Sequence, residues 1–255
     1  MAGGSGTRLF PLTKAVNKHL LPIFDKPLIY YPLTTLMLAG IREFALVTSP
    51  NEIANFQRLF GDGSQFGIEI RYVEQPTAAG IAQGLSLTQE FIAGHKVGFI
   101  LGDNLFHGIG LGRQLAQHRE VNGAHIFSYH VRNPESYGVV ELGEGDEIVD
   151  LHEKPVNPPS NLAITGLYFY DENVSDYVST LTPSKRGELE ITDLNRIYLR
   201  KSALGMTVLS KGTAWLDTGT FQGLHDASAY IKIVEERQNS KIGDPMEAAR
   251  NQGWI

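Results

Sequence analysis

Short apolar runs rich in β-branched and aromatic residues alternate along this chain with segments of helical period. Apolar runs bounded by turn formers are typical of buried strands, whereas apolar spacings of three and four residues are typical of amphipathic helices. The pattern predicts strands at 44–49, 68–73, 97–101, 125–131, 164–170 and 206–209. It predicts helices at 29–39, 52–60, 82–91, 111–119, 173–181, 191–201, 221–239 and 245–251. This alternation indicates an α/β fold with a mostly parallel sheet covered on both faces.

Residues 138–154 interrupt this pattern with alternating, hairpin-like stretches around Gly143–Gly145, and a proline-rich turn follows at 155–160. This texture indicates a small inserted β region. The sequence contains no internal repeat, no low-complexity tract and no linker long enough to separate independent domains. We therefore expect one domain over residues 1–255.

Composition narrows the function classes. The 255 residues are 42% hydrophobic and 20% charged, which is enough for a substantial core, and the net charge of −6 argues against a nucleic-acid partner. A local basic pocket for phosphorylated substrates remains compatible with that charge. The absence of cysteine excludes disulfides, thiolate nucleophiles and Cys-ligated metals. No apolar run approaches the roughly 20 residues that span a bilayer, and no signal peptide is recognisable, so we expect no membrane association and a cytoplasmic location.

The segment 3–13 reads Gly-Gly-Ser-Gly-Thr-Arg-Leu-Phe-Pro-Leu-Thr. Glycines accept positive φ and let several backbone N–H groups point toward one centre, which suits a phosphate. Arg8 follows the glycines directly and Lys18 comes ten residues later, so two cations would lie beside those donors. The segment is neither a Walker A loop nor a Gly-x-Gly-x-x-Gly turn. Composition alone leaves a flexible Gly/Ser tail as the alternative.

Two aspartates are candidate metal ligands. Asp103 follows the predicted strand at 97–101, and the carboxyl ends of strands are where open α/β sheets bind ligands. Asp217 lies far along the chain in Trp-Leu-Asp-Thr-Gly. Mg²⁺ is typically held by one or two carboxylates together with phosphate oxygens and water, so the two aspartates could share one ion. Taken singly, each could equally be a helix cap or a turn former.

A series of motifs in fixed order resembles the sugar-phosphate nucleotidyltransferases. They begin with the glycine-rich segment and Pro-Leu-Thr and continue through Lys-His-Leu-Leu-Pro at 18–22 and Asp-Lys-Pro-Leu-Ile-Tyr-Tyr-Pro at 25–32. Further matches lie at 61–67, 74–76, 101–104, 136–140, 153–155, 165–171, 186–193 and 215–219. The resemblance implies a Rossmann-like nucleotidyltransferase fold. It also implies transfer of a nucleotidyl group from dTTP to glucose 1-phosphate with Mg²⁺, giving dTDP-glucose and pyrophosphate, as at the entry to dTDP-rhamnose synthesis.

The resemblance also implies roles for individual residues. The catalytic cations would be Arg8, Lys18 and Lys154, and the Mg²⁺ ligands would be Asp103 and Asp217. Residues matching the nucleotide-binding positions are Gly3, Gly6, Thr7, Arg8, Lys18, Gln75, Gly80 and Asp103. Those matching the sugar-phosphate positions are Asn104, Gly138, Glu153, Lys154 and Ile164, with Arg186 as a further phosphate contact. An amide such as that of Gln75 can both donate and accept, which suits a pyrimidine edge.

Compared with the family pattern, the chain begins directly before Gly3, so we expect it to lack the first family strand. It also ends at Ile255, and we expect it to lack the C-terminal helical end. The resemblance implies a homo-oligomer, in the family a tetramer. Three alternatives stay open: a uridylyltransferase that uses UTP, a non-catalytic sugar-nucleotide-binding protein, and a truncated fragment.

Overall fold

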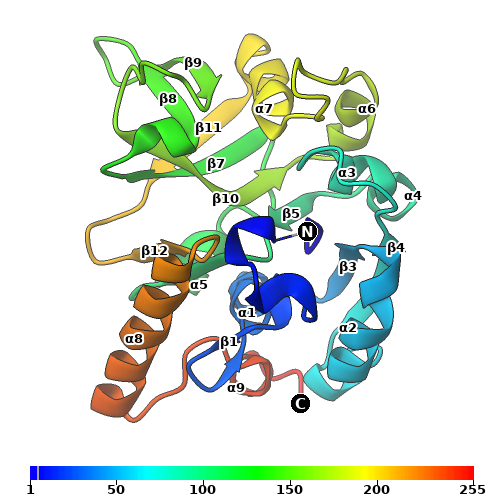
Figure 1. Cartoon of the computed structure of the whole chain (residues 1–255). Coiled ribbons are helices and arrows are strands. Elements are labelled where there is room, and N and C mark those ends of the chain that lie inside the picture. Colours follow the sequence, from blue (N-terminus) through cyan, green and yellow to red (C-terminus); the bar gives the residue numbers. More distant parts are fainter. Residues whose placement is uncertain (5) are drawn as a thin grey trace. The chain divides into compact units, whose positions relative to one another are not determined.

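The computed structural model describes residues 1–4 and 6–255, which divide into two compact units whose segments alternate along the sequence. Unit 1 comprises Met1–Thr77, Ile100–Gln117 and Gly212–Ile255, and unit 2 comprises Ala78–Phe99 and His118–Lys211. Both units contain helices and strands (Figure 1), which confirms the α/β class. The expectation of one domain over 1–255 stays a prediction.

Unit 1 combines a parallel strand pair, an antiparallel pair and a short hairpin with α-helices and several single turns of 3₁₀ helix. Its strands are β1 (Pro22–Ile23), β2 (Lys26–Pro27), β3 (Glu43–Thr48), β4 (Glu69–Glu74), β6 (Asn104–His107) and β12 (Ala214–Asp217). Its α-helices are α1 (Tyr30–Leu38), α2 (Ile53–Phe60), α5 (Leu111–Ala116), α8 (Phe221–Gln238) and α9 (Pro245–Asn251). The 3₁₀ turns are η1 (Thr7–Leu9), η2 (Leu12–Lys14), η3 (Lys18–Leu20), η4 (Pro50–Glu52) and η5 (Ser64–Phe66).

Unit 2 is organised around a six-stranded sheet with strands in the order β11-β7-β10-β8-β9, to which β5 adds by pairing with β10. The strands are β5 (Val97–Ile100), β7 (Ala124–His130), β8 (Gly138–Leu142), β9 (Ile148–Glu153), β10 (Leu162–Tyr170) and β11 (Leu204–Val208). The helices are α3 (Gln83–Leu87), α4 (Gln89–Ile92), η6 (Pro134–Ser136), α6 (Val174–Ser179) and α7 (Ile191–Arg200). Every residue of β10 is buried, as its central place in the sheet requires.

The strand pairing is more antiparallel than the sequence pattern suggests. The β3–β4 and β7–β11 ladders are parallel, whereas β10 pairs with β7 and β8 in antiparallel sense. The inserted β region expected at 138–154 is the β8–β9 hairpin, which is also antiparallel. Such neighbours need no crossover helix, so they do not produce the strand–helix alternation from which the parallel sheet was inferred.

The predicted helix at 82–91 is two short helices, α3 and α4, because Thr88 ends the first of them. The Thr88 hydroxyl donates to the carbonyl oxygens of Gly84 at 2.9 Å and Leu85 at 3.1 Å, a back-bond that competes with continued helix. Across residues 1–4 and 6–255, no helix has the length and apolarity needed to cross a bilayer.

Two apolar clusters hold unit 1 together. One gathers Met37 of α1, Phe56 and Phe60 of α2, and Ile70 of β4, and Ala249 of α9 closes it. The other joins the β1–β2 hairpin and its flanks to α1 and α8. Its buried members include Leu21, Ile23, Leu28, Tyr31, Leu224, Ala227 and Ile231. Together these clusters fix the scaffold from which the glycine-rich segment and the ends of β6 and β12 emerge.

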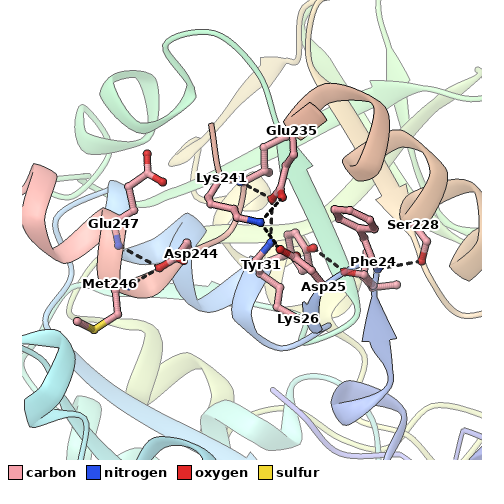
Figure 2. A network of polar contacts seen from close by, with 12 residues as sticks. Phe24, Asp25, Lys26, Tyr31, Ser228, Glu235, Lys241, Asp244, Met246 and Glu247 are labelled. Atoms are coloured by element: carbon pink, nitrogen blue, oxygen red, sulfur yellow. Dashed lines mark hydrogen bonds and ion pairs between the residues drawn. The ribbon is translucent and has the colours of Figure 1, made fainter. Parts of the chain in front are cut away.

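A ring of four charges closes the second cluster (Figure 2). Lys26 donates to Asp25 and, over 2.8 Å, to Glu235, while Lys241 donates to Asp25 and, over 3.0 Å, to Glu235. Lys26 and Glu235 are buried, and each charge has an opposite partner on both sides. Burial acts to raise the pKa of Asp25 and of Glu235, but the two lysines outweigh it and hold both pKa values below the usual range.

We expect the ring to make the protein acid-sensitive. Carboxyls with depressed pKa values in the folded state contribute stability that is fully present above their ordinary values of 3.8 and 4.5. That contribution is lost as the pH falls through the lower folded-state values. Melting temperatures measured from about pH 6 to pH 3 should therefore drop more steeply for the wild type than for Asp25→Asn. Equal slopes for the two proteins would contradict the assignment.

Candidate active site

The glycine-rich segment starts beside the carboxyl end of β3 and the backbone of Gly102. The backbone N–H of Ala2 donates to the carbonyl of Val47 in β3 over 2.7 Å, and that of Gly102 donates to the carbonyl of Met1 over 2.7 Å. Gly4 and Gly6 have φ values of 100° and 60°, a conformation that favours glycine. Ser5 lies outside the described residues. The segment therefore turns through left-handed backbone at the edge where open α/β sheets bind ligands.

Gln75 lies against the start of this segment. It follows β4, its backbone N–H donates to Thr48 over 2.7 Å, and the residue is only 3% exposed. A Cβ atom added to Gly3 would overlap the side-chain oxygen Oε1 of Gln75. The Gln75 amide thus occupies the space that the missing side chain of Gly3 leaves free.

Of the two expected cations, Lys18 lies beside Gly6 of the glycine-rich segment, and Arg8 lies beside Gly219. A Cβ on Gly6 would lie 3.3 Å from Cβ of Lys18, and one on Gly219 would lie 2.7 Å from Nη2 of Arg8. Lys18 begins η3, whose preceding residue Asn17 accepts a bond from the backbone N–H of His19 over 2.9 Å. Arg8 is exposed in η1, next to Thr7.

Asp103 makes several polar contacts within unit 1. Lys18 Nζ donates to its Oδ2, and Asn104 Nδ2 donates to its Oδ1 over 3.0 Å. The Thr218 hydroxyl donates to the Asp103 carbonyl over 2.8 Å. The Asn104 side chain is itself fixed, because its Oδ1 accepts from Trp215 Nε1 over 2.7 Å. The Asp103 and Lys18 side chains are each 14% exposed, so this is a largely desolvated ion pair.

Asp217 ends β12, and its backbone pairs with Asn104 at the start of β6. Its Oδ1 accepts from the Gly219 backbone N–H over 2.9 Å. Burial and the negative charge of Asp103 raise the pKa of Asp217, against the opposing effects of Gly219 and Arg8. Burial also acts to raise the pKa of Asp103, but Lys18 outweighs it and the pKa lies well below the usual carboxyl range. Two like charges therefore lie close enough to repel, with cations on either side.

A second set of predicted residues converges in unit 2. A Cβ on Gly138 would lie 3.3 Å from Oγ1 of Thr192 and 3.5 Å from both Oε2 of Glu153 and Cδ1 of Ile164. The Thr192 hydroxyl donates to Glu153 Oε2 over 2.6 Å. Lys154, with a φ of 44°, holds its ammonium 3.9 Å from Oε1 of Glu153. The first turn of α7 and the ends of β8, β9 and β10 thus meet around one carboxylate.

Arg186 is held by carboxylates of its own segment. Its Nε and Nη2 donate to the two oxygens of Glu190 over 3.1 and 3.0 Å, and Nη2 donates to Glu188 over 2.8 Å. Nη2 also lies 3.6 Å from Oε1 of Glu153. Burial acts to lower the pKa of Arg186, but these carboxylates outweigh it and raise the pKa. The guanidinium is therefore fixed next to Glu153 by a buried partner, Glu190.

The resemblance also implies that Gly80 lies against the nucleobase, and the structure shows a separate reason why this position requires glycine. Its φ is 101°, and an added Cβ would overlap the backbone of Leu189. Residues on either side of Gly80 also bond to Leu189. The Ala82 N–H donates to the Leu189 carbonyl over 3.1 Å, and the Leu189 N–H donates to the Ala79 carbonyl over 2.8 Å. The contact with a base stays a prediction.

The predicted site residues therefore fall into two sets. Unit 1 brings together Gly3 with Gln75, and Gly6, Thr7, Arg8, Lys18, Asp103, Asn104 and Asp217. Unit 2 brings together Gly138, Glu153, Lys154 and Ile164, while Gly80 packs separately on Leu189. Asn104 lies with the nucleotide set, although the resemblance gave it to the sugar phosphate.

Sequence reasoning missed three residues that hold the others. Thr192 bonds Glu153, Thr218 bonds the backbone of Asp103, and Glu190 holds Arg186. All three stand in motifs quoted for the resemblance, at 186–193 and 215–219. The signal that could have identified them was a hydroxyl or carboxylate side chain in the same motif as a predicted charged site residue.

A family model described as nucleotidyl transferase matches residues 1–233. The chain belongs to the nucleotidyl transferase family. Nucleotidyltransferases generally use a divalent metal ion. A relative from Xanthomonas campestris pv. campestris (strain B100), named glucose-1-phosphate thymidylyltransferase, is 52% identical over 257 aligned residues, which cover 100% of this chain and 87% of the relative. The resemblance inferred from the motifs is thereby confirmed.

Solved structures of this nucleotidyltransferase type agree. A Bacillus anthracis protein, provisionally named glucose-1-phosphate thymidylyltransferase and crystallised with a sucrose, superposes with a TM-score of 0.82 at 37% identity. The match covers 90% of this chain and 92% of that one. A UDP-glucose pyrophosphorylase complexed with UDP-glucose gives 0.79 at 28% identity, with coverages of 91% and 97%. The Rossmann-like fold expected from the resemblance is confirmed.

The Thr192 contact leads to a testable expectation. Thr192→Val keeps the branched shape but removes the hydroxyl donor to Glu153, which then loses a charge-assisted bond of about 1.5–3 kcal/mol. We expect KM for the sugar phosphate to rise about ten-fold or more, with KM for the nucleotide unchanged. Steady-state kinetics with each substrate varied in turn measure this. Equal changes in both KM values would contradict a local role for Thr192.

Proposed function

We propose that this nucleotidyltransferase transfers the thymidylyl group from dTTP to glucose 1-phosphate, giving dTDP-glucose and pyrophosphate. The observation that carries the proposal is the convergence in unit 1 of Lys18, Asp103, Asp217 and Arg8 from three distant chain segments. The relative named glucose-1-phosphate thymidylyltransferase, which is 52% identical over the whole chain, supports the choice of substrates.

In the proposed reaction, a phosphate oxygen of glucose 1-phosphate bonds to the α-phosphorus of dTTP. The bond from that phosphorus to the oxygen bridging it to the β-phosphorus breaks, and pyrophosphate leaves with the electron pair. The attacking phosphate is already anionic at neutral pH, so no protein nucleophile is required. Catalysis then consists of positioning the substrates and neutralising their charge.

Each polar residue has a role in that scheme. Arg8 and Lys18 supply positive charge to the β- and γ-phosphates, and Lys154 supplies it to the 1-phosphate. Glu153, oriented by Thr192, accepts hydrogen bonds from sugar hydroxyls. The remaining proposed contacts are backbone or packing contacts from Gly3, Gly6, Thr7, Gly80, Gly138 and Ile164, and the amide of Asn104.

The residues present fit a divalent cation. Asp103 and Asp217 repel one another, which is the situation that a shared cation relieves, and two carboxylates with substrate oxygens are a common Mg²⁺ set. Among the described residues no group of three or more histidine, aspartate or glutamate side chains could hold a metal by itself, so substrate oxygens would complete the shell. We propose Mg²⁺ as the ion. When bound, it would neutralise the reacting phosphates and orient them.

Base choice depends on Gln75 and its neighbours. Its amide can pair with the adjacent N–H and C=O of either thymine or uracil. One methyl group in an apolar pocket distinguishes the two bases by only about 1–3 kcal/mol. The structural likeness to a UDP-glucose pyrophosphorylase favours UTP as the second candidate nucleotide.

The deciding measurement is pyrophosphate release with glucose 1-phosphate, Mg²⁺ and either dTTP or UTP in parallel. We expect faster turnover with dTTP. Faster turnover with UTP would indicate that the protein is a uridylyltransferase. Nucleotide binding without turnover would support the alternative of a non-catalytic sugar-nucleotide-binding protein. The absence of a cooperative melting transition would support the alternative of a truncated fragment.

The proposed homotetramer is tested by light scattering of the purified protein. The cytoplasmic location and the link to dTDP-rhamnose synthesis stay predictions.

A further inference from the structure

The four-charge ring of Asp25, Lys26, Glu235 and Lys241 lies at one end of two elements whose other ends carry candidate catalytic residues. One element is the β1–β2 hairpin. The segment that follows its returning strand bonds back onto η3, because the Ile29 N–H donates to the His19 carbonyl over 2.9 Å. His19 follows Lys18 directly, so the backbone at Lys18 and the hairpin form one hydrogen-bonded piece.

The other element is α8. Asp217 stands three residues before Thr220, the N-cap, whose hydroxyl accepts from the Gly223 N–H over 3.0 Å. A Cβ on Gly223 would overlap the carbonyl oxygen of Asp217, so the first turn of α8 packs directly on the Asp217 backbone. Glu235 stands in the last turn of the same 18-residue helix. The helix therefore connects the Asp217 backbone to the ring as one rigid rod.

Between Asp217 and the ring, hairpin and helix meet through aliphatic side chains. Leu21, Ile23 and Leu28 from the hairpin and its flanks pack in one cluster with Leu224, Ala227 and Ile231 of α8. Apolar packing sets the separation of the two elements but is non-directional, whereas a hydrogen-bonded ion pair joins two particular positions in a fixed geometry. At the turn of the hairpin, the Phe24 N–H donates to the Ser228 hydroxyl of α8 at 3.3 Å, and Lys26 of the ring donates to Glu235 of α8 at 2.8 Å (Figure 2).

The contacts of the ring are directional and can hold α8 at one position along the β1–β2 hairpin. Glu235 Oε1 accepts from both Lys26 Nζ and the Ile242 N–H at 2.8 Å, and Glu235 Oε2 accepts from Lys241 over 3.0 Å. Asp25 takes a lysine on each of its oxygens. A buried ion pair contributes little net stability over an apolar replacement, but its fixed geometry can specify one arrangement.

We propose that the ring sets the register of α8 against the β1–β2 hairpin and thereby positions Lys18 relative to Asp217. Lys26 and Glu235 are then positioning residues, and their effect on catalysis rests on the proposed function of Lys18 and Asp217. The ring itself touches neither substrate.

The test replaces the buried bridge by apolar side chains in Lys26→Met/Glu235→Leu and weakens its edge in Lys241→Met. Lys241 is half-exposed, so the second variant leaves no buried charge without a partner. Lys232→Met is the matched control, because Lys232 forms an exposed ion pair with Glu236 on the same helix. Melting temperature, acetylation of Lys18 followed by mass spectrometry, and steady-state kinetics are measured for each protein.

We expect Lys18 to be acetylated several-fold faster in both ring variants, because its contact with Asp103 is no longer held in register. We also expect kcat/KM for dTTP to fall about ten-fold or more, with KM for glucose 1-phosphate unchanged. The Lys232→Met control should match the wild type in melting temperature, in the rate of Lys18 acetylation and in steady-state kinetics. A ring variant with a lowered melting temperature and wild-type Lys18 labelling would show that the ring only stabilises, which overturns the proposal. Labelling needs no substrate, so it gives an answer even if dTTP proves not to be the substrate.

Discussion

Replacing Asp103 by asparagine is expected to lower kcat by about 10²–10³ while the fold survives, as is typical when one electrostatic contact to a developing charge is lost. The substitution keeps the shape and the bond from Asn104 but removes the negative charge that Lys18 and a metal ion would share. The bonds that the Thr218 hydroxyl and backbone N–H donate to the Asp103 carbonyl do not depend on the Asp103 side chain, so β6 and β12 should keep their pairing.

The Asp103 prediction has a matched control in Asp226→Asn. Asp226 is an exposed aspartate of α8 that accepts one side-chain bond from Gln222 over 2.7 Å. It should retain wild-type kcat and melting temperature. Rates for both variants are measured by pyrophosphate release at saturating substrates and over a range of Mg²⁺ concentrations. Near wild-type turnover of Asp103→Asn would remove Asp103 from the mechanism.

The long, strongly patterned elements were predictable from sequence. The predicted strands at 44–49 and 164–170 correspond to β3 and β10, and the predicted helix at 221–239 corresponds to α8. Period and length are local properties, so a single sequence carries them. The β6 and β12 strands were not predicted, because each is stabilised by pairing with a segment far along the chain, and a local pattern does not record that pairing.

In the candidate site, too, some residues were predictable from the sequence and others were not. Arg8, Lys18, Asp103 and Asp217 were identified from motifs, and unit 1 brings them together. The partners that hold a site residue were not identified, since the Thr192 hydroxyl meets Glu153 across 39 positions of sequence. Such contacts are created by the fold, and neither composition nor spacing records them.

The close fit of Gly3 against Gln75 predicts a large effect from a single methyl group. In Gly3→Ala the new Cβ would overlap Gln75 Oε1, and the amide is the part that can move, because it is the end of a flexible side chain. Displacing it removes the two hydrogen bonds proposed for the base. At about 0.5–1.5 kcal/mol each, their loss should lower kcat/KM for dTTP about ten-fold or more, with KM for glucose 1-phosphate unchanged.

A double-mutant cycle separates this effect from a general disturbance of the glycine-rich segment. Gln75→Ala should lower kcat/KM for dTTP by a similar factor, and it also removes the atoms that the methyl group introduced by Gly3→Ala would meet. Adding Gly3→Ala to Gln75→Ala should therefore change little, so that the two effects are strongly non-additive. If the two losses multiply instead, the methyl group acts on the phosphate-binding backbone and not through the Gln75 amide. Competition between dTTP and UTP in the same variants then reports whether base discrimination passes through this amide.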